Sequence, residues 1–252
     1  MEVLMESKKI IKKSVDYRCG NALLEGYASY TEYKEGNKKV PGVVIIHEWW
    51  GLNDYAKHRA DMISDLGYAA FAADIYGKGL LTTNPDEAQK LATYYRSNRK
   101  LLRERVAAAI DELKKLHGVD PKKIAVMGYC FGGGAALEIA RAGADIVGAA
   151  SFHGNLDCND PAEAKNIKAK IIAFHGGNDF FVPEKDVIAF ENEMRNAGVD
   201  WQLNIYGGAV HAFTNPASGN DPSKGMAYNE KADKRSWKGL LSFFDEIFEE
   251  ER

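Results

Sequence analysis

Short runs of consecutive apolar residues recur along most of the chain and alternate with segments of helical spacing. The clearest run, residues 43–46, follows a Pro-Gly pair and ends at His47. An unbroken apolar run of this length is typical of a strand that is buried on both faces of a parallel sheet. The same signal predicts strands at residues 69–73, 124–127, 146–152 and 170–174, and a weaker one at 202–206.

The segments between these runs predict helices. Residues 54–66 begin at an Asn53-Asp54 cap, and residues 85–116 are rich in Ala, Leu, Arg and Glu after a Thr-Thr-Asn cap region. Further helices are expected at residues 184–196, ahead of an Ala-Gly pair, and at about 231–248. The pattern leaves open whether residues 85–116 form one helix or a bent lid.

Two segments near the N-terminus, residues 9–17 and 22–30, alternate apolar and polar positions around a turn at 18–21, which predicts a pair of strands. Beyond them, strand and helix alternate for about 200 residues without a linker, a repeat or a low-complexity tract. We therefore expect one α/β domain over residues 1–252, with residues 1–20 as an N-terminal extension or first strand. Its central sheet should be mostly parallel with helices on both faces, and ligands should bind at the carboxyl edge of the strands.

The composition narrows the range of partners. The 252 residues are 45% hydrophobic and 27% charged, with a formal net charge of -3. Such a chain can bury one large core, and it has no basic field that could neutralise several phosphates. We therefore expect no nucleic acid and no membrane as partner, and no segment approaches membrane-spanning length.

The three cysteines are Cys19, Cys130 and Cys158. They have neither the density of a disulfide scaffold nor the C-x-x-C spacing of a metal site. The first residues of the chain interrupt their apolar positions with charge and lack the continuous apolar stretch of a signal peptide. These features predict a cytoplasmic protein.

The strongest local signal for chemistry is the segment Gly128-Tyr-Cys130-Phe-Gly132, which joins a buried strand to a helix. A nucleophile on such a strained turn needs very small residues two positions before and after it, because a side chain there would strike the neighbouring backbone. Gly128 and Gly132 occupy those positions. Cys130 is therefore the candidate nucleophile, and the alternative is a small buried apolar residue in a tight junction.

A thiol nucleophile needs a base, and the base needs an orienting acid; on this architecture they follow in the order nucleophile, acid, histidine. Asp179 follows a predicted strand in a Gly-Gly loop, and His211 lies in a glycine-rich loop before the last helix. We therefore expect Asp179 and His211 to be the acid and the base. His153 and His175, at other strand ends, stay open as rivals. No ligand spacing supports a metal site, so no metal is expected.

The loop after the first buried strand, His47-Glu48-Trp49-Trp50, lies where this architecture supplies a second oxyanion-hole amide. The expected donors are the backbone amides of Phe131, directly after the nucleophile, and of Trp49. Glu48, if directed at the nucleophile, would keep the thiol protonated and resistant to oxidation until substrate binds. A surface-facing glutamate is the alternative. Trp50 is expected to help wall the pocket.

These motifs together resemble the dienelactone hydrolase (carboxymethylenebutenolidase) family of α/β-hydrolases, over roughly residues 20–250. The matching segments are Gly128-Tyr-Cys-Phe-Gly-Gly, His47-Glu-Trp-Trp-Gly, Asp179 before Val182-Pro183, and His211-Ala-Phe213. The resemblance implies the α/β-hydrolase fold and a Cys130-Asp179-His211 triad, with Glu48 beside the resting thiol. It implies hydrolysis of a small activated ester or lactone through a thioester, a reaction that needs no cofactor.

The substrate-binding positions depart from the family pattern. Where chlorocatechol-pathway members hold a substrate carboxylate with two arginines, this chain has Lys78 and Asn215. Lysine keeps a charge but loses the planar fork, and asparagine has no charge, so a carboxylated dienelactone should be held less firmly. The reaction type is nevertheless expected to carry over. The side chains expected to bind substrate are those of Lys78, Trp50, Tyr76, His153 and Phe213.

The expected partner is thus a small ester or lactone, and the sequence does not decide between a monomer and a homodimer. Two alternatives stay open. One is a thioesterase or small-peptide hydrolase on the same scaffold, and the other is a non-catalytic homologue that keeps the pocket for binding alone.

Overall fold

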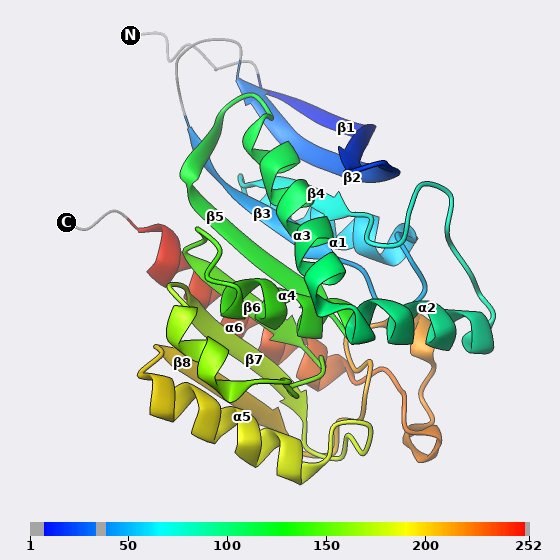
Figure 1. Ribbon diagram of the computed structural model, residues 1–252. Coiled ribbons are helices and arrows are strands. Elements are labelled where there is room, and N and C mark those ends of the chain that lie inside the picture. Colours follow the sequence, from blue (N-terminus) through cyan, green and yellow to red (C-terminus); the bar gives the residue numbers. More distant parts are fainter. Residues whose placement is uncertain (1–7, 34–38, 250–252) are drawn as a thin grey trace, which may run out of the picture.

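The computed structural model describes residues 8–33 and 39–249, which form an eight-stranded sheet flanked by helices (Figure 1). The strands are β1 (Lys8–Cys19), β2 (Ala22–Tyr33), β3 (Val40–Ile46), β4 (Ala69–Ala73), β5 (Val119–Tyr129), β6 (Gly148–Phe152), β7 (Lys170–Gly176) and β8 (Trp201–Tyr206). The helices are α1 (Asp54–Asp65), α2 (Pro85–Ser97), α3 (Arg99–Lys114), α4 (Phe131–Arg141), α5 (Glu184–Ala197) and α6 (Glu230–Phe248), with three short 3₁₀ segments.

The sheet has the strand order β1-β2-β4-β3-β5-β6-β7-β8. The pairs β1/β2 and β2/β4 are antiparallel, and every pair from β4 to β8 is parallel. The predicted α/β fold with a mostly parallel sheet is therefore confirmed. None of the described helices is long and apolar enough to cross a membrane.

The apolar runs are unbroken because both faces of the sheet are covered. Along β3, Val43 and Ile45 belong to a core cluster that includes residues of α1 and α6. Val44 and Ile46 belong to a second cluster, with residues of α3, α4 and α5. All four side chains are fully buried. Because successive side chains of a strand point to opposite faces, a strand between two helical layers must be apolar at every position.

The stretch at residues 85–116 forms two helices. They meet at Asn98, whose backbone (φ -105°, ψ 61°) leaves the helical region. Its side-chain amide donates to the carbonyl of Tyr94 at 2.6 Å, which occupies the end of α2 and lets α3 start in a new direction. The helices predicted at residues 54–66, 184–196 and 231–248 begin and end within one residue of those positions. Asn53 caps α1, and Gly198 ends α5 in the left-handed conformation.

Parallel strands bring the loops after their carboxyl ends to one edge of the sheet. The loop after β3 carries Glu48, and the β5–α4 junction carries Cys130. Asp179 follows β7, and His211 follows β8. Four residues that are far apart in the sequence are therefore neighbours at this edge.

Candidate active site

The β5–α4 junction is a strained turn that presents Cys130. Its φ of 54° lies in the left-handed region, which residues other than glycine rarely adopt. A Cβ on Gly128 would lie 2.0 Å from the carbonyl oxygen of Gly132, and a Cβ on Gly132 would lie 2.3 Å from the carbonyl oxygen of Ile46. The two glycines thus allow the turn to close against the end of β3. The sulfur is left at the carboxyl edge of the sheet.

The structure brings Cys130, Asp179 and His211 together. His211 Nε2 is 3.1 Å from Cys130 Sγ, and His211 Nδ1 is 2.7 Å from Asp179 Oδ2. Both the histidine and the aspartate are buried. The second carboxylate oxygen, Asp179 Oδ1, accepts from the Phe181 backbone amide at 3.0 Å, which fixes the loop that carries the acid. The three side chains predicted as nucleophile, base and orienting acid are therefore in direct contact.

The electrostatics favour a charged imidazole at this site. Burial by itself would lower the pKa of His211, but the neighbouring Cys130 and Asp179 outweigh it and raise that pKa to about 10. A histidine with a pKa this high stays protonated at neutral pH. The arrangement therefore supports a protonated imidazole between the sulfur of Cys130 and the carboxylate of Asp179.

Glu48 is buried in the same region. Its Oε2 accepts from the side-chain amide of Asn215 at 2.6 Å, while the hydrogen-bond partner of the sulfur is His211. Burial raises the pKa of Glu48 to about 7, against the lowering effects of the Asn215 hydrogen bond and of the His211 and Arg59 charges. Asn215 occupies one of the two positions at which the resemblance expected an arginine. A neutral amide there leaves Glu48 without a directly paired cation.

The raised pKa makes stability depend on pH. Between pH 4.5, the ordinary pKa of a glutamate, and about 7, Glu48 ionises only in the unfolded chain, so the folded state loses stability as the pH rises. Glu48→Gln keeps an acceptor for Asn215 and cannot ionise. As the pH rises across this interval, we expect the free energy of unfolding of the variant to increase relative to that of the wild type by up to about 3 kcal/mol. Denaturant titrations at several pH values measure this gain, and a difference that is constant with pH would contradict it.

A buried arginine, Arg59, is hydrogen-bonded to the segment that carries Thr214, next to the candidate site. Arg59 of α1 donates to the Thr214 carbonyl at 2.7 Å and to Asp233 at 2.8 Å. The Thr214 hydroxyl bonds His153 Nε2 at 2.7 Å and the Tyr55 hydroxyl at 2.6 Å. Sequence reasoning missed this network. The signal was present, because Arg59 occupies the apolar stripe of α1 between the buried positions 56 and 63.

His47 fixes the loop that carries Trp49. It is fully buried, its Nε2 accepts from the Ile75 amide at 3.3 Å, and its Nδ1 therefore donates to the Glu48 carbonyl. Burial lowers the pKa of His47, which keeps the ring neutral. The Tyr76 hydroxyl donates to the Trp49 carbonyl at 3.1 Å. Two side chains thus hold the backbone on either side of the Trp49 amide.

Two cavities meet at the sulfur. The larger, of about 570 Å³, is lined by Trp50, Tyr55 and Leu81 among others, and the smaller, of about 230 Å³, by Gln89, Arg96 and Asn155. Both include Trp49, Cys130, His211 and Met226 in their walls. A substrate whose reacting carbonyl lies at Cys130 can therefore extend in two directions.

Four of the five residues expected to bind substrate do not line these cavities. Trp50 lines the larger one. Tyr76, His153 and Phe213 are almost completely buried, and His153 packs against both His211 and Phe213. Their structural contribution is to hold loops and rings in place.

Lys78 lies outside both cavity walls, beside the β1–β2 hairpin. Its ammonium group is held by Asp16 at 2.7 Å and by Glu25 at 3.3 Å, on the β1–β2 hairpin. The expectation that Lys78 anchors a substrate anion is therefore not supported by its position. Two carboxylates already satisfy the charge, and the side chain is absent from both cavity walls.

The remaining histidines do not compete for the base position. His175 is mostly buried, and burial lowers its pKa. His58 and His117 are exposed. Across residues 8–33 and 39–249, no group of three or more His, Cys, Asp or Glu side chains is arranged to hold a metal ion.

Comparison with known proteins relates most of the chain to one family. The model of the Dienelactone hydrolase family matches residues 27–248. Protein usf of Aquifex pyrophilus is 32% identical over 210 residues, which cover 82% of this chain and 88% of that protein. The solved structure of m3DLH is 35% identical with a TM-score of 0.90, covering 95% of this chain and 99% of its own. A dienelactone hydrolase-like promiscuous phosphotriesterase, P91 from metagenomic libraries, is 35% identical with a TM-score of 0.88 and the same coverage.

Proposed function

This chain belongs to the dienelactone hydrolase family of hydrolases, and from that premise we propose that it cleaves small carboxylic esters or lactones with Cys130 as nucleophile, His211 as base and Asp179 as the orienting acid. The observation that carries the proposal is the continuous contact from Cys130 Sγ through the His211 ring to Asp179 Oδ2. A buried carboxylate, an imidazole and a thiol in that order are the components of nucleophilic acyl transfer.

The reaction follows from the positions of these groups. The Cys130 thiolate attacks the ester carbonyl, and the carbonyl oxygen becomes an oxyanion. The His211 imidazolium gives its proton to the departing alcohol oxygen, which leaves a thioester on Cys130. A water molecule then gives one proton to His211 as its oxygen attacks the thioester carbonyl, and collapse of the intermediate breaks the C–S bond, which releases the acid product and leaves the Cys130 thiolate beside the His211 imidazolium. In each of the two steps one proton is transferred and one bond to the acyl carbon replaces another. The triad therefore returns to its starting state.

Two backbone amides are proposed to stabilise the oxyanion. Phe131 is the first residue of α4, so its N–H has no partner within the helix and lies beside the nucleophile. Trp49 lies in the loop that His47 and Tyr76 hold, and it lines both cavities. Donors fixed before the charge develops are typically the largest single contribution to acyl transfer.

Selective alkylation tests whether Cys130 is the activated thiol. At neutral pH, iodoacetamide is expected to label Cys130 stoichiometrically before Cys158, because burial raises the pKa of Cys158 to about 11. Peptide mapping by mass spectrometry measures the order of labelling, with Cys19 as a second internal reference. Acid quenching during turnover of p-nitrophenyl acetate should trap one acetyl group on the same residue. Equal labelling of all three cysteines, or acetylation elsewhere, would contradict the proposed nucleophile.

We also propose a small-molecule partner and a cytoplasmic location. The partner is a small molecule, because the cavities at Cys130 have volumes of about 570 and 230 Å³. The compartment proposed is the cytoplasm, where three unpaired cysteines stay reduced.

A further inference from the structure

Backbone strain marks one residue to which the proposed reaction gives no role. Among the described residues, three positions other than glycine have a positive φ: Cys130 (54°), His153 (38°) and Ala212 (58°). Cys130 is the proposed nucleophile, and Ala212 directly follows the proposed base. Such strain persists only where the surrounding structure fixes the residue, and it gathers at functional sites. The strain at His153 therefore points to a role in the same site.

His153 lies directly against the ring of His211. The two ring centroids are 5.4 Å apart, with the ring planes at 64°. Phe181 also contacts the His211 ring, but Phe181 is half exposed, whereas His153 is fully buried. The backbone amide of His153 donates to the carbonyl of Phe174 at 2.8 Å, which fixes the residue at the end of β6. His153 thus gives the proposed base a buried and fixed contact.

A chain of hydrogen bonds leads from Arg59 to His153. Arg59 Nε donates to the Tyr55 hydroxyl at 3.2 Å, so the phenol oxygen is an acceptor there. The Tyr55 hydroxyl is 2.6 Å from Thr214 Oγ1, which in turn is 2.7 Å from His153 Nε2. Tyr55 and Thr214 each carry one hydroxyl proton. If Tyr55 donates to Thr214 and Thr214 donates to His153, both protons are used.

This direction of the chain fixes the ring proton of His153. With Thr214 as donor, His153 Nε2 must accept, so the proton lies on Nδ1. In the opposite direction, the Tyr55 proton would have no acceptor among the described residues. His153 Nδ1 has no partner in either case, so the first direction leaves one polar atom unpaired and the second leaves two. Burial also lowers the pKa of His153 well below its ordinary value, which keeps the ring neutral.

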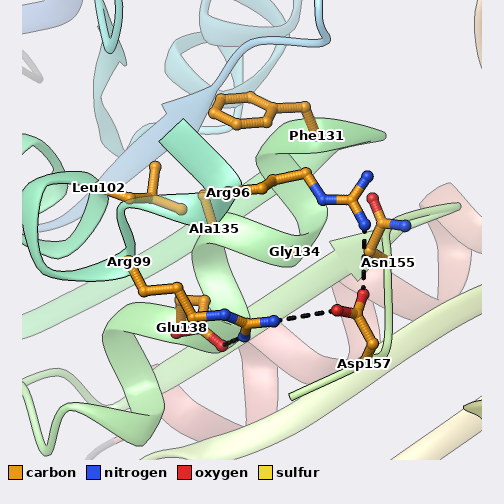
Figure 2. A pocket seen from close by; sticks show the side chains of 9 residues that line it. All are labelled: Arg96, Arg99, Leu102, Phe131, Gly134, Ala135, Glu138, Asn155 and Asp157. Carbon is orange, nitrogen blue, oxygen red and sulfur yellow. Dashed lines mark hydrogen bonds and ion pairs between the residues drawn. The ribbon is translucent and has the colours of Figure 1, made fainter. Parts of the chain in front are cut away.

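Arginines on the opposite face of the sheet end differently. In Figure 2, Arg99 reaches the carboxylates of Glu138 and Asp157, so its charge is neutralised there. Arg59 is paired with a carboxylate as well, that of Asp233, but its Nε donates to a phenol. A phenol that accepts from a cation becomes a stronger donor to the next group. Arg59 therefore sets the direction of the chain.

We propose that His153 is a positioning residue for His211. The hydroxyls of Tyr55 and Thr214, directed from Arg59, hold the His153 ring in one tautomer and one orientation. The inference rests on the hydrolysis proposed above and adds a group that acts through the base. A neutral ring at this place supports the His211 imidazolium without repelling it. Thr214 lines neither cavity, so loss of its hydroxyl should act on kcat rather than on KM.

Thr214→Val tests the inference, because valine has nearly the shape of threonine and lacks the hydroxyl. The carbonyl of residue 214 still accepts from Arg59, so the loop keeps its backbone anchor. We expect kcat for p-nitrophenyl acetate to fall about tenfold, with KM within about twofold of the wild type. Thr214→Ser restores a hydroxyl at this position and should keep kcat within about threefold of the wild type.

Two measurements separate positioning from a loss of stability. Tyr17→Phe removes another buried hydroxyl that makes two hydrogen bonds, both to the backbone of Asp74, and should leave kcat unchanged. In ¹⁵N-labelled protein, long-range ¹H–¹⁵N correlation spectra should show His153 as the neutral Nδ1–H tautomer. Thr214→Val should give a mixture of tautomers. His153→Asn, which suits a left-handed backbone, identifies the His153 signals.

A wild-type kcat in Thr214→Val, or an equal loss in Thr214→Ser or in Tyr17→Phe, would overturn the inference. A His153 ring that carries its proton on Nε2 in the wild type would overturn it as well. The tautomer is measured without substrate and therefore tests the hydrogen-bond chain independently of turnover. Absence of turnover in the wild type itself would count against the proposed function instead.

Discussion

Replacing Cys130 with alanine is expected to lower kcat/KM for p-nitrophenyl acetate by at least about 10⁴-fold. The variant keeps a Cβ of the same size at the left-handed turn, and it removes only the sulfur that would form the thioester. His211 and Asp179 stay in contact, but neither has a position from which it could replace the missing covalent step. Steady-state kinetics measures the loss. The midpoint of thermal unfolding should shift by only a few degrees, which shows that the fold is intact.

Cys158→Ala serves as the matched control for Cys130→Ala. It removes a half-buried thiol outside both cavity walls and should leave kcat/KM within about twofold of the wild type. If Cys130→Ala retained a tenth or more of the wild-type rate, the proposed nucleophile would be wrong, although the fold assignment would still hold.

Asp179→Asn is expected to lower kcat/KM by about 10³-fold. The asparagine amide would replace the carboxylate oxygen that accepts from His211 Nδ1 at 2.7 Å, and an amide donor there favours the wrong tautomer of the ring. The negative charge that helps to raise the pKa of His211 to about 10 is also lost. That pKa should therefore fall, so the imidazolium form is lost at lower pH than in the wild type.

The pH dependence separates this effect from misfolding. The side-chain oxygen of the introduced asparagine can still accept from the Phe181 amide, so the loop should keep its shape. The pH–rate profile and NMR titration of His211 measure the shift. Asp200→Asn, at an exposed position paired with Lys170, is the control and should change neither quantity. A histidine that titrates as in the wild type after Asp179→Asn would show that the carboxylate does not act on the ring.

Much of the fold and the order of the candidate triad could be predicted because they depend on local signals. Buried strands must be apolar at every position, and the turn at Cys130 requires small residues two positions away on each side. Asp179 and His211 could be selected because parallel topology places the loops after β7 and β8 at the same edge. These inferences use sequence order and residue size alone.

The rest depends on contacts between distant residues. The pairing of Lys78 with the β1–β2 hairpin, and of Asn215 with Glu48, joins segments that no local pattern connects. The part of the smaller cavity wall that α2 supplies could not be predicted, because the break at Asn98, after which α3 starts in a new direction, leaves no clear mark in a stretch rich in helix formers. From sequence alone, a charged residue on a helix is expected to be solvated, and only the fold shows whether a cavity lies beside it.

The left-handed backbone at Cys130 also limits which nucleophiles this scaffold could use during evolution. Serine has the same unbranched Cβ as cysteine and fits the turn, so exchange between a thiol and a primary hydroxyl is open to selection. Threonine carries a branched Cβ, which is strongly disfavoured at positive φ. Of the three side chains that attack carbonyls through sulfur or an alkyl hydroxyl, the backbone at this point therefore admits two.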